Sequence, residues 1–126
     1  MAVDNYTQKI VALNAVTATT TSAAIPTAGA KKITLLFTRA NHSSGSTAFT
    51  VNGSVDGTTY IACATMVENL ANAIGEGPTR VASKTLSANG SAMLALDLTY
   101  FGYTSITVTA TETTDGTHSA TVFIEY

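Results

Sequence analysis

Apolar and polar residues alternate along most of this chain, and the spacing of an amphipathic helix is nearly absent. A period of two is typical of strands that bury one face and expose the other. The clearest alternating runs are residues 49–55, 94–98, 106–110 and 120–124. Residues 33–37 are apolar on nearly both faces, which favours a strand in the middle of a sheet. The pattern therefore predicts an all-β protein.

Turn residues separate these runs at intervals of about 8 to 12 residues, as in sandwiches and barrels. Asp56-Gly57 and Asp115-Gly116 each lie between alternating runs, and Asp-Gly is a strong signal for a tight hairpin. The stretch SANGS at 87–91 gives a third hairpin signal. We predict one domain over residues 1–126, a two-sheet antiparallel β-sandwich of eight or nine strands, for which a jelly roll is one candidate form.

Two stretches give weaker signals. Residues 8–18 are a weaker candidate for a first strand, and residues 1–9 are a candidate for an extended arm, because they lack a clear period. Apolar residues within 67–74 have helix-like spacing, but the stretch is too short and too closely bounded by glycine to decide. The pattern leaves the conformation of 63–78 open.

Charged residues make up only 11% of the chain, against about 25% in typical globular proteins. Threonine and serine supply roughly a quarter of it, and the net charge is −2. A monomer usually needs more charge to stay apart from its neighbours and to protect its sheet edges. We therefore expect much of the surface to meet other protein chains, although a threonine-rich secreted adhesive module has a similar composition.

The composition also excludes several partners and chemistries. Six basic residues against eight acidic ones give no basic patch for nucleic acid, and no apolar run approaches the roughly 20 residues of a membrane span. The single cysteine, Cys63, lies in an apolar stretch and is expected to be a small buried hydrophobe. The first 21 residues lack the apolar core of a secretory signal, so we expect synthesis and assembly in the cytoplasm.

Catalytic and metal chemistry find little support. His42 and Ser43 are adjacent, so in an extended segment they point to opposite faces, and no G-x-S-x-G motif is present. His42, His118, Asp56 and Asp115 would form a metal site only if two turns converged, and both aspartates already suit Asp-Gly turns. We expect no enzyme activity, no catalytic residue, no cofactor and no metal.

Arg39 is the most informative charge, because it ends an apolar strand. Glu112 ends another alternating strand just before the Asp115-Gly116 turn, so the two side chains can pair across adjoining strands. His42 and His118 lie close to them in sequence. Such a group either braces two hairpins within one chain or faces a neighbouring subunit, and the residue pattern leaves both open.

Three aromatic residues, Tyr100, Phe101 and Tyr103, lie close together in TYFGY. Exposed aromatic rings on sandwiches can stack against sugars, but the chain has no tryptophan. Clustered Tyr and Phe more often cap a core or enter a protein interface. Sugar binding is therefore the lesser interpretation.

The stretches FTRANHSSGSTAFTVNGSVDGTTY and TATETTDGTHSATVFIEY resemble the small β-sandwich virion structural proteins of tailed bacteriophages. The resemblance covers about residues 31–126. It rests on Arg-x-x-His-x-x-Gly-Ser, Ser-x-Asp-Gly-x-x-Tyr and Asp-Gly-Thr-His-Ser.

This resemblance implies a non-enzymatic virion component assembled in the host cytoplasm. The leading form is a head decoration or cement protein that binds the major capsid protein or other virion proteins as a homo-oligomer, most simply a trimer. The N-terminal arm would then reach a neighbouring subunit. The alternative is a tail or neck component with carbohydrate or cell-surface binding.

Overall fold

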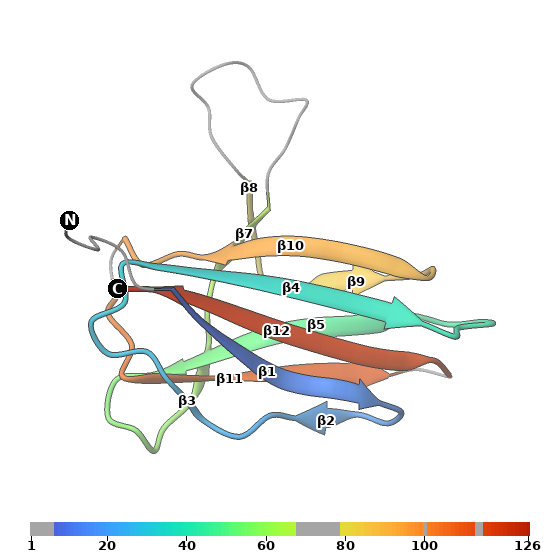
Figure 1. Ribbon diagram of the computed structural model, residues 1–126, viewed down its shortest axis with the longest axis horizontal. Helices are drawn as coiled ribbons and strands as arrows, with labels where there is room; N and C mark the ends of the chain where they lie inside the picture. The colour runs from blue at the N-terminus through green and yellow to red at the C-terminus, as the bar shows by residue number, and fades with distance from the viewer. Residues whose placement is uncertain (1–6, 68–78, 100, 113–114) are drawn as a thin grey trace.

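The computed structural model describes residues 7–67, 79–99, 101–112 and 115–126 (Figure 1). Twelve strands and no helix lie in these ranges, so none of the described residues form a helix able to cross a membrane. The strands are β1 (Thr7–Val16), β2 (Thr20–Thr21), β3 (Ile25–Pro26), β4 (Lys32–Ala40), β5 (Thr47–Ser54), β6 (Ile61–Ala62), β7 (Thr65–Val67), β8 (Thr79–Val81), β9 (Lys84–Leu86), β10 (Gly90–Leu96), β11 (Ser105–Glu112) and β12 (Thr117–Glu125).

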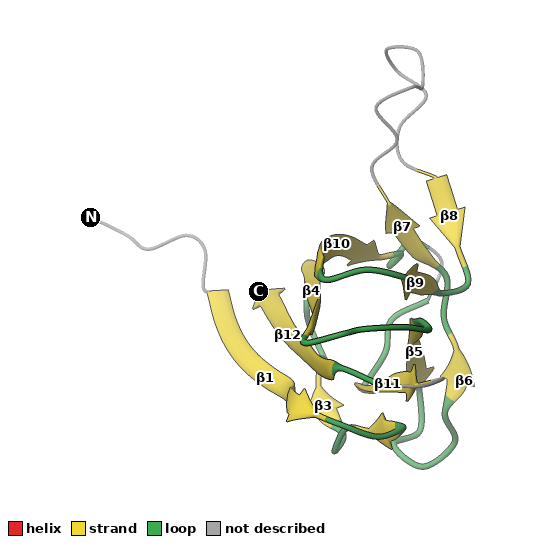
Figure 2. Ribbon diagram, turned by 90° about the vertical axis from the view of Figure 1, so that its right-hand side faces the viewer, coloured by secondary structure: helices red, strands yellow, loops and turns green. Residues whose placement is uncertain are grey.

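Two antiparallel sheets pack face to face, which confirms the predicted all-β sandwich (Figure 2). The first sheet has the order β1-β12-β4-β10-β7-β8, and β4 lies inside it as its two apolar faces predicted. The second sheet has the order β2-β11-β5-β6, with β3 also paired to β11 and β9 to β5. The weaker candidate for a first strand forms β1.

The path of the chain is that of a jelly roll. After β1 in the first sheet, the chain passes to β2 and β3 in the second, returns to β4, and then crosses to β5 and β6. Later, β10 lies in the first sheet, β11 in the second and β12 in the first again. Without the short strands β7, β8 and β9, and with β2 and β3 taken as one edge, eight principal strands form two four-stranded layers.

The core lies between the two sheets and is built by the alternating runs. The rings of Phe37 from β4 and Phe49 from β5 stack across it, with centroids 4.5 Å apart. The alternation fails at Val55, which is 65% exposed because β5 ends at Ser54. The buried apolar residues are Leu13, Ile25, Ile33, Leu35, Phe37, Phe49, Val51, Cys63, Leu94, Leu96, Ile106, Val108, Ala110, Ala120, Val122 and Ile124.

Two of the predicted hairpins are wrong. Asp115-Gly116 leads from β11 in the second sheet to β12 in the first, and residues 87–89 lead from β9 to β10 in the same way. β11 already has strand partners on both sides, so β12 cannot pair beside it and instead inserts between β1 and β4. Asp56-Gly57 does join two strands of one sheet, with Gly57 at a φ of +83°.

The strand number also exceeds the predicted eight or nine, because alternation cannot reveal strands of two or three residues. At the N-terminus, residues 7–9 belong to β1 and pair with β12, so they are not a free arm. Residues 1–6 lie outside the described ranges, as does most of the helix-like stretch at 67–74, of which Val67 ends β7.

Candidate functional site

Three connections cross between the sheets at one end of the sandwich, to the right in Figure 1. They are residues 41–46 between β4 and β5, residues 87–89 between β9 and β10, and the segment between β11 and β12. Arg39, near the end of β4, lies among all three and is only 1% exposed. We call Arg39, Glu112, Asp115 and His118 the Arg39 cluster.

The guanidinium of Arg39 holds the three connections by hydrogen bonds to backbone carbonyls. Its Nη1 donates to Gly45 at 2.8 Å and to Leu86 at 3.2 Å. Its Nη2 donates to Ser44 at 3.0 Å and to Asp115 at 2.6 Å. Because arginine carries several donors in a planar fork, one side chain satisfies acceptors in two of the connections and at the end of β9, directly before the third.

Two carboxylates offset the buried positive charge. The Nη2 of Arg39 lies 3.8 Å from an oxygen of Glu112 and 3.8 Å from an oxygen of Asp115. The predicted pairing of Arg39 with Glu112 is therefore present within one chain. The two strands are not adjoining, however, because β4 lies in the first sheet and β11 in the second, so the ion pair joins the two sheets. The side chain of Glu112 is 8% exposed, so either charge would carry a large desolvation penalty if it were buried without the other.

His118 extends the cluster into the core, and its side chain is fully buried. Its Nδ1 lies 2.9 Å from the hydroxyl of Thr47, and its Nε2 hydrogen-bonds the carboxylate of Glu112. Hydroxyl, imidazole and carboxylate follow one another in the order of a nucleophilic triad. Thr47 is also 0% exposed, so a substrate has no path to this hydroxyl, and the chain of hydrogen bonds acts to brace the fold.

His42 lies near the cluster but does not face Glu112 or His118. Its Nε2 contacts the carbonyl of Ser87 at 2.7 Å, and its backbone N–H donates to the amide oxygen of Asn89 at 2.9 Å. It thus ties the connection at 41–46 to the one at 87–89. Of the four residues that the sequence grouped here, the structure brings three into direct contact and places the fourth beside them.

Asp115 ties the same loop to the start of β12. Its carboxylate accepts hydrogen bonds from the hydroxyl of Ser43 and from the backbone N–H groups of Ser43 and Ser44. These bonds, the serine hydroxyl first, lower the pKa of Asp115 to about 2. Gly116 follows at a φ of +113°, where an added Cβ would lie 3.2 Å from the Nε of Arg39.

The metal site that the sequence raised as an alternative is not assembled. Asp56 follows the far end of β5, away from Asp115, because Thr47 begins that strand beside the cluster and Ser54 ends it. Its Oδ1 accepts hydrogen bonds from Ser54, Thr58 and Thr59, and the two backbone bonds hold its pKa well below the usual range. No group of three metal-ligating side chains occurs within the described ranges.

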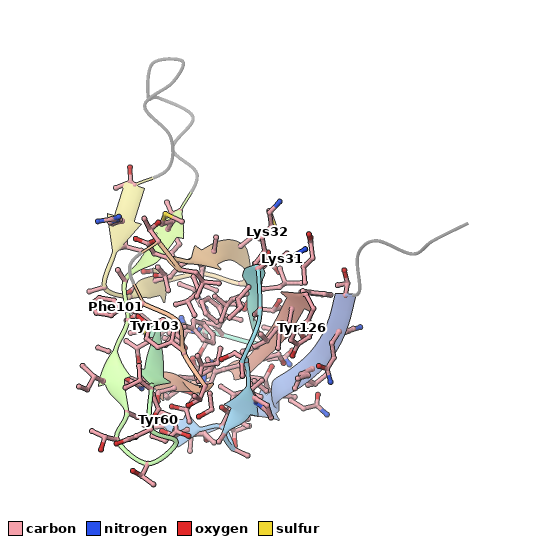
Figure 3. All side chains as sticks on the ribbon, turned by 90° about the vertical axis from the view of Figure 1, so that its left-hand side faces the viewer. Lys31, Lys32, Tyr60, Phe101, Tyr103 and Tyr126 are labelled. Carbon is pink, nitrogen blue, oxygen red and sulfur yellow. The ribbon has the colours of Figure 1, made fainter. Side chains whose placement is uncertain are left out.

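An apolar groove of about 400 Å³ lies at the opposite end of the sandwich (Figure 3). Phe101 and Tyr103 border it with ring centroids 6.5 Å apart, and Phe101 is 63% exposed. Tyr100 lies outside the described residues. The lining is Gly53, Val55, Asp56, Thr59, Ile61, Ala62, Phe101 and Tyr103.

Tyr103 is fixed in this groove by close packing. A Cβ on Gly53 would lie 2.5 Å from its ring and 2.6 Å from the sulfur of Cys63, so any other residue at this position would force these side chains to shift. Burial raises the pKa of Tyr103 to about 12 and also raises the pKa of the Cys63 thiol. This packing was not predicted from the sequence, although a glycine within a strand is a known signal for a close approach of this kind.

Comparison with known proteins yields one informative likeness. The whole chain superposes on 98% of the crystal structure of the SPBc2 prophage-derived protein YomS, with a TM-score of 0.72 and 9% sequence identity. At this identity the likeness shows a shared fold. No protein-family model matches the chain, and no curated protein matches it.

Proposed function

We propose that this chain is a non-enzymatic structural protein of a tailed bacteriophage, most specifically a head decoration or cement protein. The observation that carries the proposal is the likeness in fold over the full chain to YomS, a protein derived from a prophage. The sequence resemblance to small virion proteins over residues 31–126 points the same way. The proposed site of action is the virion.

The distribution of polar groups supports a mechanical role. Two of the few charged residues, Arg39 and Glu112, lie in the interior, where they join the two sheets at one end. A subunit that resists pressure on a shell needs such bracing, whereas its contacts add up over many copies. The cluster members Arg39, Glu112 and His118 are buried, so they serve the rigidity of the subunit.

The outer face of the first sheet supplies a candidate contact surface. The strand registers align Val11, Thr121, Leu36 and Met93 in one row across β1, β12, β4 and β10. The three apolar members are 55%, 37% and 64% exposed. An apolar row on a surface of low charge suits contact with the major capsid protein or another virion protein.

Binding to preformed phage heads tests this proposal. We expect the purified protein to sediment with undecorated heads and to raise the temperature at which they rupture. Met93→Glu should weaken this binding, whereas Thr85→Glu, an exposed change on the second sheet, should not. Electron microscopy of particles from the same source should locate the protein on the head. Its absence from purified particles would overturn the proposal.

The groove supports a second candidate, a tail or neck component that binds carbohydrate or a cell surface. An exposed Phe101 beside an apolar groove is a surface on which a sugar ring can stack. On this alternative, Phe101→Ala abolishes binding to host cells or to a glycan panel, and Val55→Ala, on the same groove, weakens it less. Wild-type protein that binds neither cells nor glycans removes this candidate.

A further inference from the structure

The two sheets have four outer edges within the described part of the chain, and one differs from the rest. The edge strands β2, β3 and β6 have two residues each and β8 and β9 have three, which are too short to pair with another chain. Inside the first sheet, β10 pairs with β7 only at Ala95 and Leu96, so residues 90–94 form a shorter open stretch. β1 has ten residues and forms the remaining edge (Figures 1 and 2). Native sheets normally protect a long edge, so we expect β1 to pair with a strand of another chain.

Only the first half of β1 is a regular template. Residues 7–11 pair with residues 121–125 of β12 without interruption. Two register shifts follow, after Val11 and after Leu13, and Ala15 takes a φ of +50°. Such bulges bend a strand away from a would-be partner, so they protect the second half of the edge. We call residues 7–11 the open edge segment.

We propose that the open edge segment pairs antiparallel with the same segment of a second copy of this chain, about a two-fold axis. Among the described residues, none pairs with its outer side. A two-fold pair of identical strands covers both edges at once and leaves no new edge. The segment also suits itself, because half-buried Ile10 at the margin of the core gains a cover from Ile10 of the second copy.

The side chains select one register for this pair. In an antiparallel pair, two residues that lie directly opposite each other have side chains on the same face of the sheet. The two-fold axis must therefore pass between one residue and the same residue of the second copy. An axis at Lys9 would place two ammonium groups opposite each other, and an axis at Val11 would extend the pair into the bulge. An axis at Ile10 keeps the lysines apart and places Lys9 opposite Val11 of the second copy. It limits the regular pairing to residues 9–11, because Gln8 and Thr7 would lie opposite Ala12 and Leu13 of the bulged part.

This pairing differs from the three-fold assembly that the sequence resemblance implies. A two-fold strand pair predicts an even number of copies, whereas a simple ring of three predicts a trimer. The inference does not depend on the proposed role in the virion, because the pair forms in solution without a particle.

Charge substitutions at Val11 test both the pairing and its register by sedimentation velocity. Val11 is 55% exposed, so a charge there should leave the fold intact. Val11→Lys places two lysines opposite Lys9 residues and should weaken the dimer about tenfold at low salt. Val11→Glu creates opposite-charge pairs instead, so it should dimerise at least as well as wild type. Met93→Lys, the control, lies on the same face three strands away and should have no effect.

Three results would overturn the inference: equal weakening by both Val11 variants, equal weakening by Met93→Lys, or a wild type that stays monomeric up to about 1 mM. Disulfide trapping gives a second measurement that holds even if a charged variant misfolds. An oxidised mixture of Lys9→Cys and Val11→Cys chains should form a mixed dimer, whereas each variant alone should not, because its own cysteines lie diagonally. Failure of the mixture to cross-link would refute the proposed register.

Discussion

Replacing Arg39 with alanine should lower the free energy of unfolding by about 3–5 kcal/mol, which is typical of removing one partner from a buried ion pair. The structure gives the reason. Arg39 is 1% exposed, donates to four backbone carbonyls and lies 3.8 Å from the carboxylate of Glu112, which is only 8% exposed. Without it, the buried carboxylate of Glu112 loses its arginine, although it keeps its contact with His118, and four backbone carbonyls lose a donor. Such a loss is a large part of the 5–15 kcal/mol that stabilises a typical domain.

Arg80 provides a matched control, because it is the other arginine of the chain. It pairs with Asp97 at the shorter distance of 2.8 Å, yet its side chain is 54% exposed. Its partner Asp97 has a side chain that is only 6% exposed, but this carboxylate also accepts a hydrogen bond from the backbone N–H of Thr99. Removing Arg80 therefore leaves Asp97 with a partner, and Arg80→Ala should cost less than Arg39→Ala. Distance alone would rank the two arginines in the opposite order, which makes the comparison a test of burial.

Urea unfolding followed by far-ultraviolet circular dichroism measures both variants. A loss below 1 kcal/mol for Arg39→Ala would refute the reasoning that the cluster braces the monomer. Loss of oligomers with unchanged monomer stability would instead place Arg39 at a subunit contact. Arg39→Lys should lie between wild type and Arg39→Ala, because lysine keeps the charge but lacks the planar fork of donors.

Three further outcomes are expected from the same unfolding assay. Gly53→Ala should cost about 1–3 kcal/mol, because its Cβ would meet an aromatic ring at 2.5 Å, whereas Gly102→Ala meets nothing within 4 Å and should be nearly neutral. Thr47→Val should cost about 1–3 kcal/mol by leaving a buried imidazole nitrogen without its partner, and Thr50→Val, on the opposite face of β5, should cost less. The pKa of Asp115 is lowered to about 2, so the stabilising effect of its carboxylate is complete above pH 4 and is lost toward pH 2. The difference in free energy of unfolding between wild type and Asp115→Asn should therefore vanish as the pH falls through this range. A difference that persists at pH 2 would contradict this.

The layered fold could be predicted from sequence because burial on one face of a strand leaves a period of two. Residues 106–110 and 120–124 alternate in this way, and the core buries Ile106, Val108, Ala110, Ala120, Val122 and Ile124. The partner of each strand could not be predicted in the same way. Asp115-Gly116 has the chemistry of a hairpin turn, yet the chain changes sheets there, because both sides of β11 are already occupied.

The same distinction applies to the candidate site. The pairing of Arg39 with Glu112 could be predicted, since both are charged residues at the ends of apolar strands. The four carbonyl acceptors of Arg39 could not, because a backbone carbonyl is present at every residue and leaves no mark in the sequence. The groove beside Phe101 was also missed, since Ile61 and Val55 become neighbours only through pairing of β6 with β5 and the packing of a distant loop.

The buried cluster has a consequence for the surface. A chain with 11% charged residues that places Arg39 and Glu112 in its interior has still fewer charges left to keep copies apart. Lys9 is the only charge in the open edge segment, and it disfavours one register of self-pairing without preventing the others. Charge in this protein therefore has two separable uses. Arg39 should control whether the monomer folds, and Lys9 should control how two monomers meet.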